Sequence, residues 1–349
     1  MTLPRRTHPR PLDIKSGRVD LTHGGGGRAM AQLVDELFVA AFDNEALNQG
    51  NDQAAFDVPG GRMVMTTDGY VIHPLVFPGG DIGSLAVHGT VNDVAMAGAR
   101  PLSLSAGFII EEGFPLAELK FIVDSMARAS REAGVPVVTG DTKVVEKGKG
   151  DGIFITTAGI GLVPAGVVIS GDRARAGDAI LVSGTMGDHG VAVMSKREGL
   201  EFETEILSDS APLHTMVAEM VAACPGIRVL RDPTRGGLAA TLNEIAAQSR
   251  VGMMIKETAV PVKPQVRGAC ELLGLDPLYV ANEGKLICIC DPTDADTLLG
   301  IMRGHRFGAD AALIGHCRED AHHFVQMETA MGGMRVVDWL AGEQLPRIC

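Results

Sequence analysis

Acidic residues beside turn-forming residues recur along this sequence of 349 residues and could bind a cation. Asp68 in TTDG, Asp141 in TGDTK and Asp232 in RDPTRGG each directly follow an apolar, strand-like run. Proteins built from helices and strands commonly place ligand groups at such strand ends. Asp93 lies instead in a Gly- and Ala-rich helical segment, where an ionised side chain needs a partner. A single Asp is usually a surface residue, so it is the recurrence of the pattern that suggests a common site.

Two glycine-rich turns directly before helices could bind phosphate. Backbone N–H groups at a helix N-terminus form an anion site when no side chain covers them. The first turn matches neither the Walker A pattern nor GxGxxG, so a flexible loop remains the alternative there. The first turn consists of Gly24, Gly25, Gly26 and Gly27, and the second contains Thr234, Gly236 and Gly237.

Carboxylates repel phosphate, but the two features become compatible if divalent cations lie between them. Mg²⁺ prefers oxygen ligands and usually bridges one or two carboxylates to substrate phosphates. The two features together therefore predict a magnesium–nucleotide site shared by both halves of the chain. Lys143, two residues after Asp141, could stabilise a developing negative charge.

Two further residues could take part in chemistry. Glu283, before an apolar strand, is either a turn residue or a general base whose pKa is raised by burial. Cys349 ends the chain and is either a chance terminal residue or a swinging carrier of a covalently attached group. Its thiol would have a pKa near ~8.5, which makes it a poor resident nucleophile. Cys288 and Cys290 alternate on a strand and are expected in the core.

Composition excludes several classes of protein. Lys and Arg number 31 against 43 Asp and Glu, a net charge of −12, so nucleic acid is not an expected partner. Hydrophobic residues make up 46% and charged residues 21%, which is typical of a globular chain. No apolar run is long enough for a membrane span, and the start shows no secretory signal. Six cysteines are too few for a disulfide scaffold, so we expect a reduced, cytoplasmic protein.

Hydrophobic periodicity predicts a first, α+β block and a second block of helices and strands, joined by a polar linker over 170–177. The Gly- and Ala-rich helix should begin after Asp81 as N-cap and should pack tightly against a neighbour. Helices are expected over 30–42, 81–99, 116–133, 214–223, 238–248, 265–273 and 293–303. Strands are expected over 63–67, 70–72, 102–110, 135–139, 153–163, 179–183, 227–230, 252–256, 285–290 and 311–315.

Motifs along nearly the whole chain resemble those of one family. The chain carries THGGGG, TTDGYVIHPLVFPGGDIG, GTVNDVAMAGARP, TGDTKVV, RDPTRGG, ANEGK and a final PRIC. This set resembles HypE, the carbamoyl dehydratase family of [NiFe]-hydrogenase maturation within the PurM-like ATP-binding superfamily. The resemblance implies a PurM-like two-domain fold. An α+β domain over 1–168 would dimerise through its sheet, an α/β domain would span 169–334, and a mobile tail would span 335–349.

The resemblance also implies an activity, with ATP bound between the domains and Mg²⁺ beside it. A carbamoyltransferase, HypF, would load a carbamoyl group on Cys349. ATP-dependent dehydration would convert that group to a thiocyanate, and the cyano group would pass to iron on a HypC–HypD complex. The implied partners are thus a second copy in a homodimer, HypF and HypC–HypD, without a membrane.

The roles that fit this chemistry fall on the motif residues. Glu283 would act as the base and Lys143 would stabilise negative charge on the oxygen or phosphate. Mg²⁺ would be held by Asp68, Asp93, Asp141 and Asp232. The nucleotide would be contacted by Gly24, Gly25, Gly26, Gly27, Asn92, Thr142, Thr234, Gly236 and Gly237.

Two rival functions remain open from the sequence. The chain could be another PurM-like ATP enzyme that acts on a free small molecule, in which case loss of Cys349 would leave turnover intact. It could also be a nucleotide-gated assembly protein whose terminal segment docks a partner, with no ATP consumed per modification.

Overall fold

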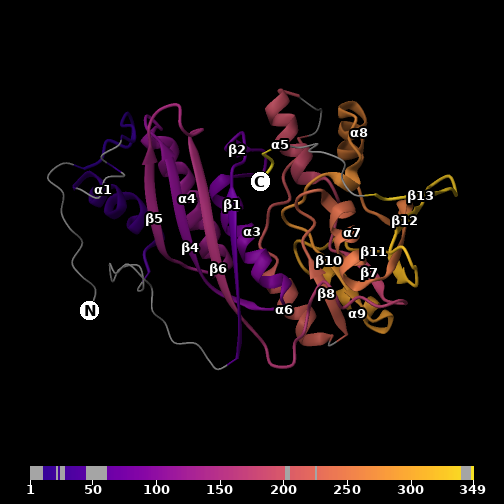
Figure 1. Ribbon diagram of the computed structural model, residues 1–349. Coiled ribbons are helices and arrows are strands. Elements are labelled where there is room, and N and C mark those ends of the chain that lie inside the picture. Colours follow the sequence, from indigo (N-terminus) through magenta and orange to yellow (C-terminus); the bar gives the residue numbers. More distant parts are fainter. Residues whose placement is uncertain are drawn as a thin grey trace.

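The computed structural model describes residues 11–20, 23, 28–44, 61–200, 205–224, 226–338 and 347–349. Two sheets of different topology divide these residues into an N-terminal half, from β1 to β6, and a C-terminal half, from β7 to β13 (Figure 1). The expected mixture of helices and strands in two blocks is confirmed. The boundary expected at 168–169 falls in the connection between β6 and β7.

The N-terminal half is a four-stranded sheet in the order β1-β6-β4-β5. Strands β4 and β5 are parallel, and the other pairs are antiparallel. Helices α3 and α4 cover one face of this sheet, and a helical segment over 28–42 packs at its β5 side, where Phe38 contacts Phe108 (Figure 1). The strands are β1 (Arg62–Tyr70), β4 (Arg100–Glu111), β5 (Val137–Val145) and β6 (Ile153–Val163), with a small hairpin of β2 (Val76–Phe77) and β3 (Gly80–Asp81). The helices are α1 (Arg28–Leu33), a π-helix (Val34–Val39), α2 (Ala40–Phe42), α3 (Ile82–Met96) and α4 (Leu116–Ala133).

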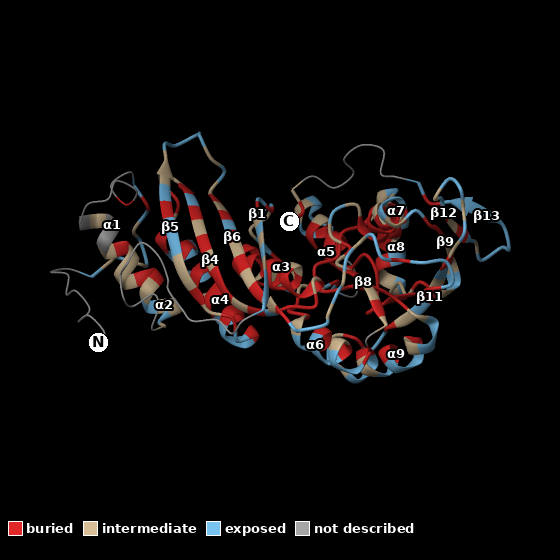
Figure 2. Cartoon of the chain, turned by 60° about the horizontal axis from the view of Figure 1, so that its bottom comes forward, coloured by how far each residue is buried: buried red, intermediate tan, exposed pale blue. Residues whose placement is uncertain are grey.

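Helix α3 lies buried at the centre of the molecule, and its small residues explain how (Figure 2). A Cβ on Gly83 would lie 2.3 Å from the backbone oxygen of Ile122 in α4, and one on Gly89 would lie 2.4 Å from the Tyr70 hydroxyl. Asp81 caps the helix by accepting hydrogen bonds from the N–H groups of Gly83 and Ser84, at 2.8 and 3.2 Å. The expected N-cap and the expected close packing are both confirmed.

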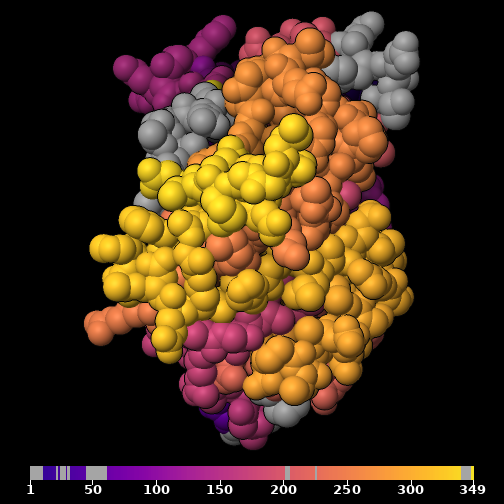
Figure 3. All heavy atoms as spheres, turned by 90° about the vertical axis from the view of Figure 1, so that its right-hand side faces the viewer, coloured from indigo at the N-terminus to yellow at the C-terminus, as the bar shows by residue number. Residues whose placement is uncertain are grey.

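The C-terminal half is built on a seven-stranded sheet in the order β13-β12-β9-β11-β7-β10-β8. Cys288 and Cys290 lie fully buried on β10, as expected. Strands β12 and β13 lie on the outer face of this half (Figure 3). The strands are β7 (Ala179–Val182), β8 (Ile227–Arg231), β9 (Gly252–Lys256), β10 (Ile287–Cys290), β11 (Ala312–Arg318), β12 (Val325–Glu328) and β13 (Met334–Val336). The helices are α5 (Asp188–Glu198), α6 (His214–Ala223), α7 (Gly237–Ser249), α8 (Pro264–Leu273) and α9 (Ala295–Gly304).

Several features differ from the sequence-based expectations. Strand β1 runs unbroken through Asp68 and Gly69, where a turn was expected, and β5 continues through Asp141 instead of ending before it. Helix α5, strand β12 and the hairpin of β2 and β3 were not expected. Residues 335 and 336, expected at the start of the tail, form the edge strand β13. None of the helices in the described part of the chain is long and apolar enough to cross a membrane.

Candidate active site

A cleft of about 700 Å³ lies between the two halves. It is bordered by β1 and α3 on one side and by the turn between β8 and α7 on the other. This volume is in the range of small-molecule sites. Its polar lining combines carboxylates, hydroxyls and cations: Thr66, Asp93, Arg231, Asp232, Thr234, Arg235, Thr241 and Glu244.

The turn between β8 and α7 brings a helix N-terminus to this cleft. Gly236 and Gly237 adopt positive φ angles of 73° and 60°, and a Cβ on Gly237 would lie 2.6 Å from the Val280 carbonyl oxygen. A side chain at Gly237 would clash there, and the Gly237 N–H donates to the Thr234 carbonyl oxygen at 3.0 Å, which closes the turn at the start of α7. Thr234 lies on the cleft wall, so the turn that was predicted to bind an anion borders the cleft, and anion binding there stays a prediction.

Asp93 and Asp232 bring negative charge to the same cleft. Asp93 accepts a hydrogen bond from the Thr66 hydroxyl at 2.9 Å. Burial is the main cause that raises the pKa of Asp93, and the charge of Asp68 raises it further. Burial, followed by the charge of Asp93, raises the pKa of Asp232 to about 7. These carboxylates therefore repel one another, and a cation between them would relieve the repulsion.

Asp68 adds to this negative potential from β1. Its side chain accepts the N–H of Gly69 at 2.8 Å. Side chains alternate between the two faces of a strand, so Asp68 lies on the same face of β1 as Thr66. This is the face toward α3. Among the described residues no group of three or more His, Cys, Asp or Glu side chains converges as a metal site. Two carboxylates plus substrate phosphates suffice for Mg²⁺, so Asp93 and Asp232 fit a shared magnesium–phosphate site.

The structure does not bring Asp141, Thr142 and Lys143 to this cleft. They lie on β5, at the opposite edge of the sheet from β1, and three strand spacings put the row of Asp141 about 14 Å from β1. Lys143 donates to Asp141 at 2.7 Å, with both side chains 62% exposed, and this bond lowers the pKa of Asp141. Thr142 is buried beside Phe38 and Phe108.

Asn92 has a different role from the phosphate contact that we expected. Its Nδ2 donates to the carbonyl oxygens of Ala211 and Glu283, at 3.0 and 3.1 Å. Its Oδ1 accepts the N–H of Leu213 at 2.8 Å. The hydrogen bonds of this amide therefore join α3 to two segments of the C-terminal half.

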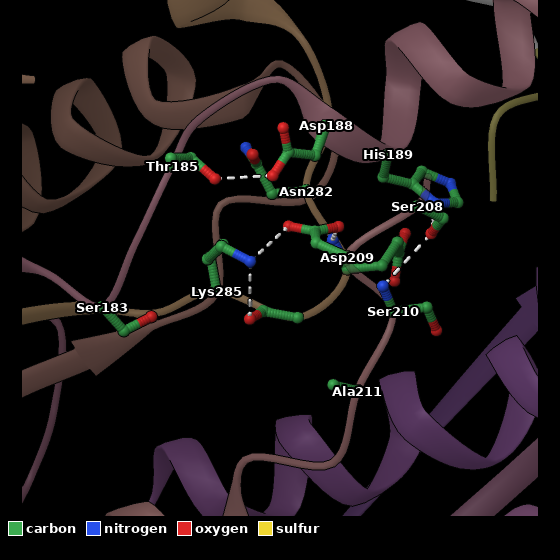
Figure 4. A network of polar contacts seen from close by, with 12 residues as sticks. Ser183, Thr185, Asp188, His189, Ser208, Asp209, Ser210, Ala211, Asn282 and Lys285 are labelled. Atoms are coloured by element: carbon green, nitrogen blue, oxygen red, sulfur yellow. Dashed lines mark hydrogen bonds and ion pairs between the residues drawn. The ribbon is translucent and has the colours of Figure 1, made fainter. Parts of the chain in front are cut away.

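Glu283 is a buried acid next to the cleft, 3% exposed. Its backbone N–H donates to Asp209 at 3.0 Å, and Asp209 in turn pairs with Lys285 at 3.2 Å (Figure 4). Its Oε1 has no hydrogen-bond partner among the described residues. Burial, then the charges of Asp232 and Asp209, raise the pKa of Glu283 well above 4.5. This environment favours the interpretation as a general base over that as a turn residue.

The end of the chain reaches the same place. The C-terminus lies between the halves, near β2 and α5 (Figure 1). Ile348 is 3% exposed and packs in the core of the N-terminal half, with Cys349 against it. Burial, followed by the charge of Glu283, raises the pKa of Cys349 to about 12, while Arg235 lowers it. Cys349 is therefore a neutral thiol, close enough to Glu283 and to Arg235 of the cleft for both charges to act on its pKa.

Gly24, Gly25, Gly26 and Gly27 lie outside the described residues. The sequence reasoning missed several groups that the structure brings to the site. Arg231 and Arg235 could have been found, because they flank Asp232 within RDPTRGG. Thr66 and Asp209 carry no signal of their own, since only the fold brings them to Asp93 and Glu283.

Comparisons with known proteins agree with this geometry. Residues 50–163 match the family described as AIR synthase related protein, N-terminal domain, and residues 175–328 match the corresponding C-terminal domain. A protein of Cupriavidus necator named carbamoyl dehydratase HypE is 72% identical over 343 residues, which cover 98% of each chain. The expected PurM-like fold and family resemblance are confirmed.

Two solved structures are similar along most of the chain. A crystal structure of the hydrogenase maturation protein HypE in complex with ATP has 53% sequence identity and a TM-score of 0.92, covering 95% of this chain and 99% of that one. A HypE–HypF complex has 50% identity and a TM-score of 0.78, covering 88% and 99%. A thiamine-monophosphate kinase at 21% identity and a TM-score of 0.64 shares the fold.

Proposed function

This chain belongs to the HypE family, and from that premise we propose that it dehydrates an S-carbamoyl group on Cys349 to a thiocyanate in an ATP-dependent reaction. The observation that carries the proposal is the position of Cys349. Its thiol is close enough to Glu283 for that charge to raise the pKa of Cys349, and to Arg235 of the cleft for the opposite effect. The cleft itself combines an anion site with carboxylates suited to Mg²⁺.

The reaction requires the loss of one oxygen and two protons from the carbamoyl group. ATP supplies the phosphoryl group that turns the carbamoyl oxygen into a leaving group. The carbon–oxygen bond then breaks, phosphate leaves, and the nitrogen forms its triple bond to carbon as its two protons depart. Glu283 would accept a proton there, since its buried carboxylate is near enough to act on the pKa of Cys349 and its Oε1 has no partner among the described residues.

Nucleotide and metal would be held by the cleft residues. Thr234, Gly236 and Gly237, at the N-terminus of α7, would bind phosphate. Asp93 and Asp232 would bind Mg²⁺, and Asp68 would add negative charge near them. Asn92 would position Glu283 instead of touching the nucleotide. Gly24 to Gly27 keep their proposed phosphate role.

We also propose the homodimer that the family resemblance implies. The outer face of the four-stranded sheet carries exposed apolar side chains, including Met63 at 48% and Ile109 at 40%, and no helix in the described part of the chain covers it (Figure 1). A second copy would cover this face. Asp141 and Lys143 are exposed on β5 of that sheet, so their proposed roles require that they serve the cleft of the second copy.

Partners follow from the same premise. HypF would load the carbamoyl group, as the HypE–HypF complex of a relative supports. A HypC–HypD complex would accept the cyano group. Both would act in the cytoplasm.

Mass spectrometry of the C-terminal peptide tests this function against its rivals. The full chain is incubated with HypF, carbamoyl phosphate and ATP. We expect the gain of one carbamoyl group on Cys349, followed by the loss of one water. An enzyme for a free small molecule would leave Cys349 unmodified, and an assembly protein would leave ATP unconsumed; either result would overturn the proposal.

A further inference from the structure

All three carbonyl oxygens of the terminal residues 347–349 accept hydrogen bonds from the body of the protein. The N–H groups of Val71 and His73 donate to the oxygens of Cys349 and Arg347, at 3.1 and 3.2 Å. This spacing is that of an antiparallel pair. The oxygen of Ile348 points the other way and meets Nε2 of His189 at 2.8 Å.

In an ordinary antiparallel ladder, the carbonyl oxygens of Val71 and His73 would accept N–H groups of the tail backbone. Here two arginine side chains donate to these oxygens instead. Nε of Arg347 donates to the oxygen of Val71 at 2.9 Å. Nε of Arg197, at the end of α5, donates to the oxygen of His73 at 2.9 Å, and its Nη2 donates to the oxygen of Arg347 at 2.7 Å. Arg197 therefore joins the tail to the segment against which it lies.

The tautomer of His189 is set by its surroundings. Nδ1 lies 2.8 Å from the hydroxyl of Ser208, which itself accepts the N–H of Ser210 at 3.1 Å (Figure 4). The Ser208 proton therefore points to Nδ1, and Nε2 carries the proton that the Ile348 carbonyl accepts. Burial lowers the pKa of His189, which keeps the ring neutral. The ring edge of Phe77 packs against it at a centroid distance of 5.4 Å.

We propose that His189 and Arg197 of α5 are positioning residues that hold the last three residues against segment 71–73, so that Cys349 stays near Glu283. The contacts are to main-chain oxygens, so they fix the position and direction of the tail, while the burial of Ile348 sets its depth. Loss of either donor leaves a tail carbonyl without that partner and shifts the tail toward its undocked state. The proposal rests on the proposed function only in that Cys349 carries the reacting group.

The rate of alkylation of Cys349 by iodoacetamide measures docking without nucleotide or carbamoyl group. It is read by mass spectrometry on the full chain. We expect His189→Leu and Arg197→Ala to raise the rate about tenfold, because each variant lacks tail hydrogen bonds. His189→Gln keeps a side-chain N–H and should restore most of the protection. Lys196→Ala removes the neighbouring exposed cation of α5 and should match the wild type.

The other five cysteines are buried and report on the fold in the same samples. Faster labelling confined to Cys349 supports the proposal. An unchanged rate at Cys349 in both variants overturns it, as does labelling of Cys349 that rises only together with labelling of the buried cysteines. If labelling follows the expectation but Cys349 is never dehydrated in the wild type, the proposed function fails and the docking site stands.

Discussion

Asn92 of α3 donates a hydrogen bond of 3.1 Å to the backbone oxygen of Glu283, which lies in the other half of the chain. The same amide nitrogen donates to Ala211, so one side chain fixes the segment before α6 and the acid beside Cys349. The position of the proposed base therefore depends on a residue of the N-terminal half.

Substitution of Asn92 by Asp tests this dependence. A carboxylate cannot donate to the oxygens of Ala211 and Glu283, and each unpaired group costs about 1–3 kcal/mol. We expect the dehydration rate per folded molecule to fall about tenfold or more as Glu283 shifts. Asn243→Asp is the matched control, because Asn243 donates in the same way to Ala239 and Val337, away from the cleft. An equal loss of rate in both variants would refute the positioning role.

The pH dependence of dehydration should follow the ionisation of Glu283. Its pKa lies well above 4.5, so the proton-accepting form is scarce at low pH and the rate should rise with pH through a range above 4.5. Glu283→Gln should lower the rate about 100-fold or more and abolish this dependence while ATP still binds. Asp178→Asn, at a buried carboxylate paired with Arg228, should retain both rate and profile. A wild-type profile in the Glu283→Gln variant would exclude this base.

The close contact between α3 and α4 predicts a large difference between two glycine substitutions. A methyl group at Gly83 would meet the Ile122 oxygen at 2.3 Å, so Gly83→Ala should lower the free energy of unfolding by about 1–3 kcal/mol. Gly300 of α9 has open space around it, so Gly300→Ala should be neutral or stabilising by up to about 1 kcal/mol. Denaturant titration measures both, and equal stability of the two variants would contradict the packing described.

Sedimentation tests the proposed dimer. Ile109 lies on the uncovered face of the central strand β4, so a charge there in Ile109→Asp should convert dimers to monomers. Met331→Asp places the same charge on a 95% exposed side chain of the C-terminal half and should leave the dimer intact. A monomeric wild type, or an Ile109→Asp variant that stays dimeric, would show that this face is not the interface.

Periodicity and caps predicted much of the fold. The amphipathic pattern placed α4 (Leu116–Ala133) at its observed bounds, and Asp81 marked the start of α3. The prediction of a turn at Gly69 was wrong. A glycine after an aspartate is typical of a turn, but Gly69 lies on the exposed face of β1 opposite Thr156. A local pattern cannot tell an outward strand glycine from a turn glycine.

The candidate site was predictable in composition but less so in arrangement. Motif chemistry singled out residues that the fold brings near one another, including Asp93, Asp232 and Glu283, and their roles stay predictions. It also grouped Asp141 with them, although sheet order puts β5 at the far edge from β1. Strand order depends on long-range pairing, and so does the use of the Asn92 amide, so neither can be read from spacing along the chain.

The fate of the carbamoyl oxygen tests the central claim most directly. Cys349 is carbamoylated from carbamoyl phosphate that carries a heavy-oxygen label in its carbonyl group, and a single turnover is started with ATP. If the tail delivers the carbamoyl group to the nucleotide cleft, the label should appear in the released phosphate as the thiocyanate forms on Cys349. Thiocyanate formation with the label in water instead, or ATP consumption with the label still on Cys349, would contradict the account.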